Sequence, residues 1–495
     1  MKKIFIILIL FILTTRIVIP IIDYDVRNSA NIKQYSDDVI IIQTKSINDI
    51  ILPNNLNSAT LDSVNIKSGS LRNTLNSINA REINRIIHKY PDENLDKIFF
   101  IKINNYDPLT AVGILQTDPN IEFATPDYIT QVNIFPNDPL FFYEWGLHNT
   151  GTLPGIPGTS GANDADIDAP EAWDLETGDS NVVIAILDTG IDYTHPDLAA
   201  NVWINPGEIP NNNIDDDSNG YIDDYHGYDF CASVNCATND SNPADGNGHG
   251  THVGGTIAGI TNNNIGISGI CWNCKLMILK TLSDGGTGVT RKAIPALIYA
   301  ADNGADITSN SWSSSSISNP ALKTAFDYAK NNGVISIASA GNDNNNGFII
   351  PGSFDNLIGV AAIDTYGFKA PYSNYGPWVD IAAPGGESCP WDSYDILSTI
   401  PTYPVNIQSH SCYTGNFNGY YTYAAGTSMA APHVSGVAAL LLSKNPSLTV
   451  DQAYTLLRSG VDPNPISSIY FGEGRISAHK VLSYNLPAVA YLDSS

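Results

Sequence analysis

Three polar residues that can together attack a carbonyl group lie far apart in the sequence, each in a short glycine-containing motif. Asp188 lies in ILDTGID, His249 in NGHGTHVGGTIAG and Ser428 in AAGTSMAAPHVSGVAALLL. A serine hydroxyl is a weak nucleophile at neutral pH, so a neighbouring imidazole must accept its proton. A carboxylate on the other ring nitrogen fixes the tautomer and stabilises the imidazolium. We therefore predict that Asp188, His249 and Ser428 form the catalytic triad of a hydrolase.

An acyl-transfer site also needs hydrogen-bond donors for the oxyanion of the tetrahedral intermediate. The stretch SAGND places Asn342 just after a buried apolar run, and we predict that its side-chain amide is one donor. The backbone N–H of Ser428, at the start of an apolar helix, is the second predicted donor. Taken alone, each of these residues is explained by a turn or a helix cap. The combination, in the chain order Asp, His, Ser, favours catalysis.

The elements that must position these residues alternate between apolar strands and helices. NVVIAIL, LMILK, VISIASA and LIGVAAI are short continuous apolar runs, typical of parallel strands that are covered on both faces. Helical stretches at 289–303 and 319–332 separate some of them. This alternation predicts an α/β fold, a doubly wound parallel sheet with helices on both faces. Functional residues gather at the carboxyl ends of the strands in such sheets, where Asp188 lies.

The composition divides the chain near residue 137. Residues 1–137 carry 13 of the 24 Lys and Arg and 14 of the 50 Asp and Glu, which leaves 11 basic and 36 acidic residues for the rest. The net charge of −26 argues against nucleic-acid binding, because phosphate backbones require basic patches. Residues 23–131 mix strand-like runs with helical stretches near 71–90 and 108–117, which indicates a small α+β domain.

The N-terminus resembles a secretory signal. Lys2 and Lys3 precede the apolar run Ile4–Leu13, which is shorter than the roughly 20 residues that span a bilayer. A retained N-terminal anchor is the alternative, and we expect no other membrane segment.

All six cysteines lie in the acidic part, and a secreted chain with an even number favours disulfides. Six cysteines allow 15 pairings. Proximity favours Cys231–Cys236, Cys271–Cys274 and Cys389–Cys412. For the CWNC stretch, a redox pair or half of a zinc site is the alternative.

The motifs DTGID, GHGTHV and GTSMAAPHV resemble the three active-site signatures of the subtilisin-like serine proteases, the subtilases. The resemblance runs from about residue 135 to 485. It implies the three-layer subtilisin fold, endopeptidase activity on polypeptides, and the oxyanion role for Asn342. Residues 23–131, above all LQTDPNIEFATPDY, resemble the subtilase propeptide, which acts as an intramolecular chaperone and inhibitor.

These observations predict a secreted, self-processing zymogen that is monomeric when mature. The predicted division is a signal peptide at 1–22, a propeptide at 23–131, a linker and mature N-terminal segment at 132–170, a peptidase domain at 171–485 and a tail at 486–495.

The resemblance also implies a substrate-binding strand and a specificity pocket. SNSW resembles the edge strand that pairs with an extended substrate, so Ser311, Trp312 and Ser313 are predicted to bind substrate, although Ser313 stands where the family usually has Gly. The residues after Asn342 correspond to one side of the primary pocket. This correspondence places Ile349 at the pocket floor and predicts a shallow pocket that prefers medium apolar residues.

An acidic loop predicts a first calcium site. DDDSNGYIDD places alternate oxygens in an EF-hand-like pattern, although His226 stands where the loop would need its final acid. The predicted ligand residues are Asp215, Asp217, Asn219, Tyr221 and Asp223. A solvated acidic loop without a metal is the alternative.

The resemblance implies a second calcium site, in which HPDL and NNNIGISG correspond to the family's high-affinity site. Its implied ligands are Asp197, Asn263, the carbonyls of Thr261, Ile265 and Ile267, and Asp138.

Two functions other than a peptidase are compatible with parts of this pattern. A catalytically inactive subtilase-fold binding or surface protein is the first alternative, and the intact triad with Asn342 argues against it. An α/β-hydrolase esterase is the second. That class uses G-x-S-x-G and the order Ser, Asp, His, whereas this chain has GTSMA and the order Asp, His, Ser.

Overall fold

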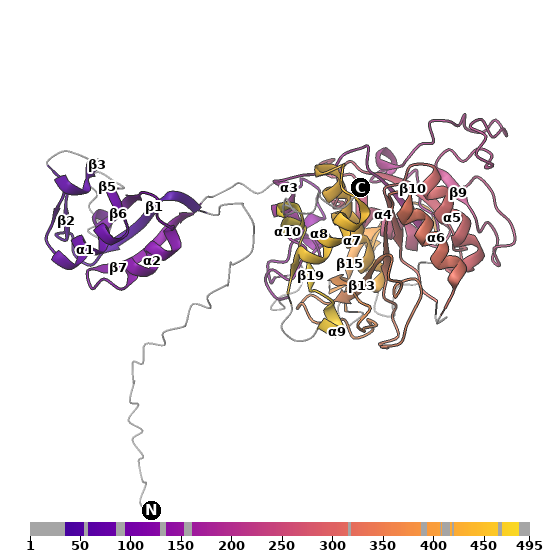
Figure 1. Cartoon of the computed structure of the whole chain (residues 1–495). Helices are drawn as coiled ribbons and strands as arrows, with labels where there is room; N and C mark the ends of the chain where they lie inside the picture. The colour runs from indigo at the N-terminus through magenta and orange to yellow at the C-terminus, as the bar shows by residue number, and fades with distance from the viewer. Residues whose placement is uncertain are drawn as a thin grey trace, which may run out of the picture.

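The computed structural model describes residues 35–53, 58–85, 95–128, 135–152, 161–314, 318–387, 394–405, 407, 416–417, 420–463 and 468–484. Two units with separate hydrophobic cores follow one another along the chain (Figure 1). Among the described residues, no helix is long and apolar enough to cross a membrane.

The N-terminal unit is one antiparallel sheet with two helices packed against it. The strand order is β3-β5-β6-β1-β7, and β2 pairs separately with β4. The alternating burial of β6, with Phe99, Ile101 and Ile103 inside, explains how one face of the sheet covers the core. The elements are β1 (Tyr35–Thr44), β2 (Ile50–Ile51), β3 (Ser58–Thr60), β4 (Asn65–Ile66), α1 (Gly69–Ser77), β5 (Ala80–Arg85), β6 (Ile98–Ile103), α2 (Pro108–Gln116) and β7 (Ile121–Tyr128).

The described part of 23–131 therefore has the α+β architecture that the sequence predicts, with one correction. The helix expected at 71–90 ends at Ser77, and residues 80–85 form strand β5. Asn79 adopts a left-handed conformation with φ of 54°, which ends the helix and turns the chain into the strand.

The second unit is built on a nine-stranded sheet of order β18-β19-β14-β13-β12-β11-β8-β10-β9, in which β8 to β14 are parallel. The strands are β8 (Val183–Asp188), β9 (Gly227–Asp229), β10 (Lys275–Lys280), β11 (Ile307–Asn310), β12 (Ile335–Ser339), β13 (Ile358–Ile363), β14 (Ile381–Pro384), β18 (Val461–Asp462) and β19 (Arg475–Ile476). A small separate sheet contains β15 (Ile396–Thr399), β16 (Asn416–Phe417) and β17 (Tyr421–Ala424).

Helices cover both faces of this sheet, as Figure 1 shows. The helices of the second unit are α3 (Ala169–Trp173), α4 (His249–Ala258), α5 (Thr290–Asp302), α6 (Pro320–Asn331), α7 (Thr427–Lys444), α8 (Val450–Ser459), α9 (Ser468–Phe471) and α10 (Ala478–Ser483). Short 3-10 turns occur at Leu61–Ser63, Leu95–Lys97, Phe141–Tyr143 and Ala199–Asn201.

Strand β8 shows why both faces are covered. Ile184 and Ile186 pack in one core with side chains of α4 and α7, while Val183, Ala185 and Leu187 pack in another with α5 and α6. Because alternate side chains of a strand point to opposite faces, a strand that is apolar throughout must be buried on both. The doubly wound α/β fold predicted from the sequence is confirmed.

Candidate active site

Asp188 and His249 meet where β8, an interior strand of the sheet, ends. Asp188 is the last residue of β8 and is fully buried, and His249 is the first residue of α4. The Nδ1 atom of His249 lies 2.7 Å from the Oδ1 atom of Asp188. A Cβ atom on Gly250 would lie 2.1 Å from the Gly190 carbonyl oxygen, so only glycine lets α4 begin this close to the strand end.

Thr189 and Asp245 hold this pair in place, and sequence reasoning missed both. The Thr189 backbone N–H donates to the Asp188 carboxylate at 2.7 Å, and its hydroxyl donates to Asp245 at 2.9 Å. Asp245 also accepts from the backbone N–H groups of Asn247, Gly248 and Thr251 around the start of α4. The sequence signal that could have indicated them is the polar residue next to each catalytic side chain's motif centre: Thr189 follows Asp188 in DTG, and Asp245 precedes His249 by four residues in DGNGH.

The environment of His249 favours its protonated form. Burial acts to lower the pKa of His249, but the charge and hydrogen bond of Asp188, with a further contribution from Asp245, raise that pKa above its ordinary value of 6.5. Its side chain is 27% exposed, so the ring reaches the surface of the cleft. An imidazole in this setting can accept a proton and hold the resulting charge beside a buried carboxylate.

Ser428 is the second residue of α7, and in this structure it is hydrogen-bonded to Ser311 of the predicted substrate-binding segment. Its hydroxyl donates to the Ser311 carbonyl at 3.0 Å, and the Ser311 hydroxyl donates to the Ser428 carbonyl at 2.9 Å. Ser428 and His249 line the same cleft. Hydrogen bonds of a catalytic group are often rearranged when substrate binds, so this geometry is compatible with transfer of the serine proton to His249.

The two predicted oxyanion donors lie close to the same glycine, Gly426. The Asn342 side-chain oxygen accepts from the Thr427 backbone N–H at 2.9 Å and from the Thr427 hydroxyl at 2.8 Å. This leaves the Nδ2 atom of Asn342 as a donor toward Gly426. A Cβ atom on Gly426 would lie 3.3 Å from Asn342 Nδ2 and 3.6 Å from the Ser428 backbone nitrogen, so both nitrogens lie near the same side of that glycine.

The cleft that contains these groups has a volume of 840 Å³. Its lining includes His249, Ser428, Asn342, Ser311, Trp312, Ser313 and the segment 285–290. The predicted substrate-binding residues 311–313 therefore border the triad.

Ile349 differs from its expected place. It is not among the residues that line the cleft, and it is 5% exposed, with its side chain close to Gly341. The hydrogen bond from the Ile349 backbone N–H to the Ser353 hydroxyl, at 2.7 Å, holds the segment in a turn that points this side chain inward. The expectation that Ile349 fills the pocket floor is therefore not supported by its position.

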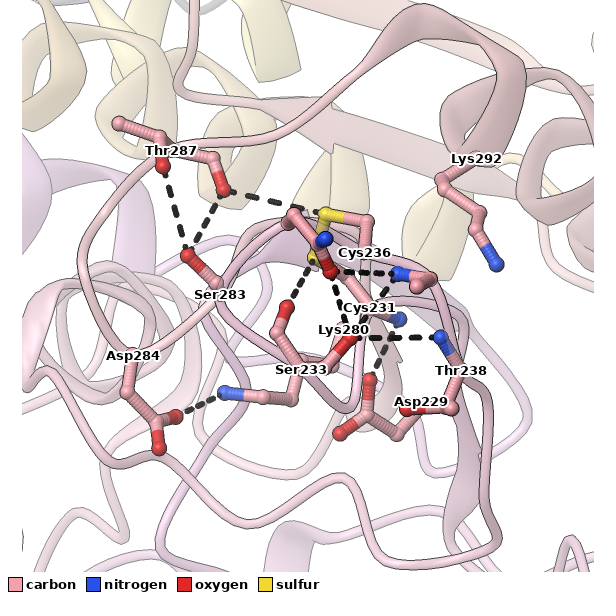
Figure 2. The surroundings of a disulfide bond; sticks show 12 residues. Asp229, Cys231, Ser233, Cys236, Thr238, Lys280, Ser283, Asp284, Thr287 and Lys292 are labelled. Atoms are coloured by element: carbon pink, nitrogen blue, oxygen red, sulfur yellow. Dashed lines mark hydrogen bonds and ion pairs between the residues drawn. A yellow bond between two sulfur atoms is a disulfide. The ribbon is translucent and has the colours of Figure 1, made fainter.

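Two of the expected disulfides are present, Cys231–Cys236 and Cys271–Cys274. The second bond excludes a metal on the CWNC thiols in this structure. Cys389 and Cys412, the third expected pair, lie outside the described residues. Figure 2 shows the first disulfide beside Ser283 and Thr287, which belong to the loop next to the cleft. In the same region the ammonium group of Lys280 contacts Asp284 at 2.7 Å.

The calcium ligands implied by the family resemblance converge on one loop. Asp197 accepts from the Asn263 side chain at 2.6 Å and from the Ile267 backbone N–H at 3.0 Å. Asp138 accepts from the backbone N–H groups of Asn262 and Asn263. Thr261 and Ile265 belong to the same loop, 261–267, which the carboxylates of Asp138 and Asp197 both contact.

The electrostatics of this region fit a cation. Burial raises the pKa of Asp197 to about 6, and the charge of Asp138 adds to that effect. Glu144, which sequence reasoning missed, is buried nearby and accepts from the Ser268 backbone N–H at 2.9 Å. Burial raises the pKa of Glu144 well above its ordinary value, and the charges of Asp197 and Asp138 raise it further. Calcium takes oxygen ligands of this kind, and its charge would offset the repulsion.

The acidic loop is arranged differently from the expectation. Oxygen atoms of Asp215 and Asp217 lie within 4.8 Å of one another and of a Glu208 oxygen, a residue that the sequence pattern did not include. The Asp223 carboxylate instead accepts from the backbone N–H groups of Asn212 and Asn213, both at 2.9 Å. Asp223 has a left-handed backbone, with φ of 52°, which turns its side chain to that other part of the loop.

The two remaining predicted ligands of the acidic loop lie close to the cluster. Asn219 donates its side-chain N–H to Asp217 at 3.1 Å, and its side-chain oxygen accepts from the Tyr221 backbone N–H at 2.8 Å.

Comparisons with known proteins agree with this geometry. Residues 179–474 match the model of the subtilase family, Peptidase_S8. A thermophilic serine proteinase from Bacillus sp. (strain AK1) is 34% identical over 80% of this chain and 80% of its own. Thermitase from Thermoactinomyces vulgaris is 35% identical over 64% of this chain and 94% of its own. A solved protease structure from Pseudoalteromonas arctica PAMC 21717 matches with a TM-score of 0.57 and 30% identity, over 70% of this chain and 98% of that one.

The parallel sheet, the Asp–His pair at its carboxyl edge and the serine at the start of α7 define a subtilisin-like hydrolase. The chain belongs to the subtilase family, and it is a serine endopeptidase.

Proposed function

We propose that this chain is made as a secreted, self-processing zymogen, and that its mature form hydrolyses peptide bonds through an acyl-enzyme on Ser428. The observation that carries the proposal is the convergence of the Asp188–His249 pair, Ser428 and Asn342 on one cleft. Polypeptides are the substrates, bound in extended form along residues 311–313 by β-strand addition.

Catalysis begins when substrate enters the cleft and the Ser428 hydroxyl exchanges the Ser311 carbonyl for His249 as its hydrogen-bond acceptor. His249 takes the proton as the serine oxygen attacks the peptide carbonyl, and Asp188 stabilises the imidazolium. The negative charge on the former carbonyl oxygen is held by Asn342 Nδ2 and the Ser428 backbone N–H.

The peptide bond then breaks as His249 gives its proton to the leaving amine. Water, deprotonated by the same imidazole, hydrolyses the acyl-enzyme and restores Ser428. Preformed donors act mainly on charge that develops in the transition state, so they raise turnover more than they strengthen substrate binding.

The zymogen proposal rests on the separate N-terminal unit. Its own buried core, including Ile40, Leu71 and Phe99, supports folding as a distinct domain ahead of the peptidase. As a propeptide it would act as chaperone and inhibitor, and the mature peptidase would release it by cleavage between the two units. The basic and apolar N-terminal segment supports secretion.

Calcium is proposed as a structural cofactor held by Asp138, Asp197 and Asn263 with carbonyl groups of the loop 261–267. Bound there, the ion would neutralise buried carboxylates and fasten the segment that contains Asp138 to this loop. It takes no part in the chemical steps.

The proposal is tested on purified full-length protein. Incubation should convert the chain to a shorter form that cleaves casein, while Ser428→Ala should stay full length and inactive. An inactive subtilase-fold binding protein would leave both chains uncleaved and casein intact. Maturation of purified Ser428→Ala without another protease would contradict self-processing.

A further inference from the structure

The loop that carries the proposed oxyanion donor Asn342 is exposed to solvent. Residues 342–348 follow strand β12, and every one of them is exposed. Exposed loops move more than the elements that they connect, unless they are tied to the body of the protein. An oxyanion donor needs a fixed position, because a displacement of about 1 Å can cost about 10² in rate. The backbone on both sides of Asn342 must therefore be held by other residues.

Asn374 makes these connections from inside the protein. It is 1% exposed. Its Oδ1 atom accepts from the backbone N–H groups of Asp343 and Asn345, both at 2.9 Å. Its Nδ2 atom donates to the Ala340 carbonyl, and its backbone N–H donates to the Gly341 carbonyl, each at 2.9 Å. One buried residue thus holds backbone groups both before and after the oxyanion residue.

The side-chain amide of Asn374 matches its partners. Its oxygen has two lone pairs for the two N–H groups, and its nitrogen has a donor for the carbonyl. Gly341 adopts a left-handed conformation with φ of 91°, which bends the chain just ahead of Asn342. A Cβ atom on Gly341 would lie 2.5 Å from Asn374 Nδ2, so the amide lies directly against this bend.

Asn374 is not among the residues that line the cleft, so it can act on the reaction only through the loop. Thr427 has a complementary part. It donates to the side-chain oxygen of Asn342, and its own hydroxyl oxygen accepts from the Gly341 backbone N–H at 3.0 Å. Thr427 orients the Asn342 amide, whereas Asn374 holds the backbone that carries it.

We propose that Asn374 is a positioning residue of the peptidase, which holds the loop so that Asn342 Nδ2 reaches the oxyanion. The inference rests on the proposed role of Asn342. Without the Asn374 amide, the N–H groups of Asp343 and Asn345 can bond to water, since both residues are exposed, and the loop is released. Asn342 is then present but misplaced. Turnover should fall, while the binding of substrate along residues 311–313 is retained.

The proposal is tested by a double-mutant cycle of Asn342→Ala and Asn374→Ala. All variants are matured with an immobilised active protease that is then removed, and kcat and KM are measured with a chromogenic peptide. Asn374→Ala should lower kcat by about tenfold to 10², with KM nearly unchanged. In the Asn342→Ala background the same change should lower kcat by less than about threefold, because residues that act as a unit are not additive.

Asn356→Ala is the matched control. It removes another buried asparagine, which donates to Asp327 of helix α6 at 2.7 Å and lies ahead of β13, at the edge of the sheet opposite to the loop. This variant should retain the kcat of the parent. If Asn374→Ala does not fold, Asn374→Leu takes its place in the cycle, since leucine has a similar shape but cannot form the hydrogen bonds.

Three results would overturn the proposal while the role of Asn342 stands: a near-parent kcat in Asn374→Ala, an equal fall in kcat in both backgrounds, or a loss confined to KM. An equal fall in both backgrounds would show that Asn374 only supports the fold. A near-parent kcat in Asn342→Ala would instead remove Asn342 from the mechanism, and this inference with it.

Discussion

The Nδ1 atom of His249 lies 2.7 Å from the buried carboxylate of Asp188, where the interior strand β8 ends and helix α4 begins. This relationship fixes one ring nitrogen as the donor and leaves the other for the serine proton. The charge of Asp188, the hydrogen bond donated by Asn342 and the pKa of His249 can each be tested separately.

Asp188→Asn should reduce turnover by about 10⁴-fold, because an amide at this position favours the wrong imidazole tautomer and cannot stabilise the imidazolium. Turnover is measured with a chromogenic peptide on mature protein. Where a variant does not mature by itself, a separately produced active protease is supplied to process it before the comparison. Asp240→Asn changes an exposed acid that does not line the cleft, so it serves as the control and should retain near-parent turnover. A loss of less than tenfold in Asp188→Asn would remove Asp188 from the mechanism.

Asn342→Ala should lower kcat by about 10² to 10³ and leave KM nearly unchanged, since the lost donor acts on the oxyanion. Asn346→Ala, an exposed asparagine in the same loop, is the matched control. A variant with near-normal kcat, or with a loss confined to KM, would show that Asn342 does not bind the oxyanion.

The pH dependence of kcat/KM should report the raised pKa of His249. The base must be neutral to accept the serine proton, so activity rises as the pH increases through this pKa. Since Asp188 and Asp245 raise the pKa, the midpoint of the acid limb should lie above 6.5. A midpoint below 6.5, measured on the free enzyme at subsaturating substrate, would contradict the electrostatics described here.

Calcium should stabilise the protein more strongly at neutral pH than at acid pH. Because the pKa of Asp197 is raised from 3.8 to about 6, the calcium-free fold loses stability as the pH rises through that range and the buried acid ionises. Calcium binds the ionised form, so it restores that stability, by about 2.7 kcal/mol at 100 times its dissociation constant. The melting temperature of Ser428→Ala is measured with calcium and with chelator, near pH 4 and above pH 7. The difference between calcium and chelator at each pH gives the stabilisation by calcium. Equal differences at the two pH values would contradict this account.

The features predicted correctly from the sequence are the order of the elements and the residues at their ends. The order of strands and helices and the convergence of Asp188, His249 and Asn342 follow from apolar runs and from the rule that parallel strands end at one edge. These residues lie at or beside element ends, where their location depends little on the path of a loop.

The errors concern side-chain direction and contacts between segments within loops. Asp223 fits the alternating pattern, but its left-handed backbone turns it to Asn212 and Asn213. Glu208 was missed because a turn brings it back to Asp217, although it precedes the acidic motif. Such placements depend on backbone torsions that no residue pattern specifies.

The most direct test of the central claim is covalent labelling of the mature protein with a fluorophosphonate, followed by mass spectrometry of its peptides. This probe reacts with serines activated by a neighbouring base. The account predicts one modified residue, Ser428, and a loss of peptidase activity in proportion to the fraction of Ser428 that is labelled. The Ser428→Ala variant should not be labelled. Labelling at another serine, or full peptidase activity after complete modification of Ser428, would contradict it.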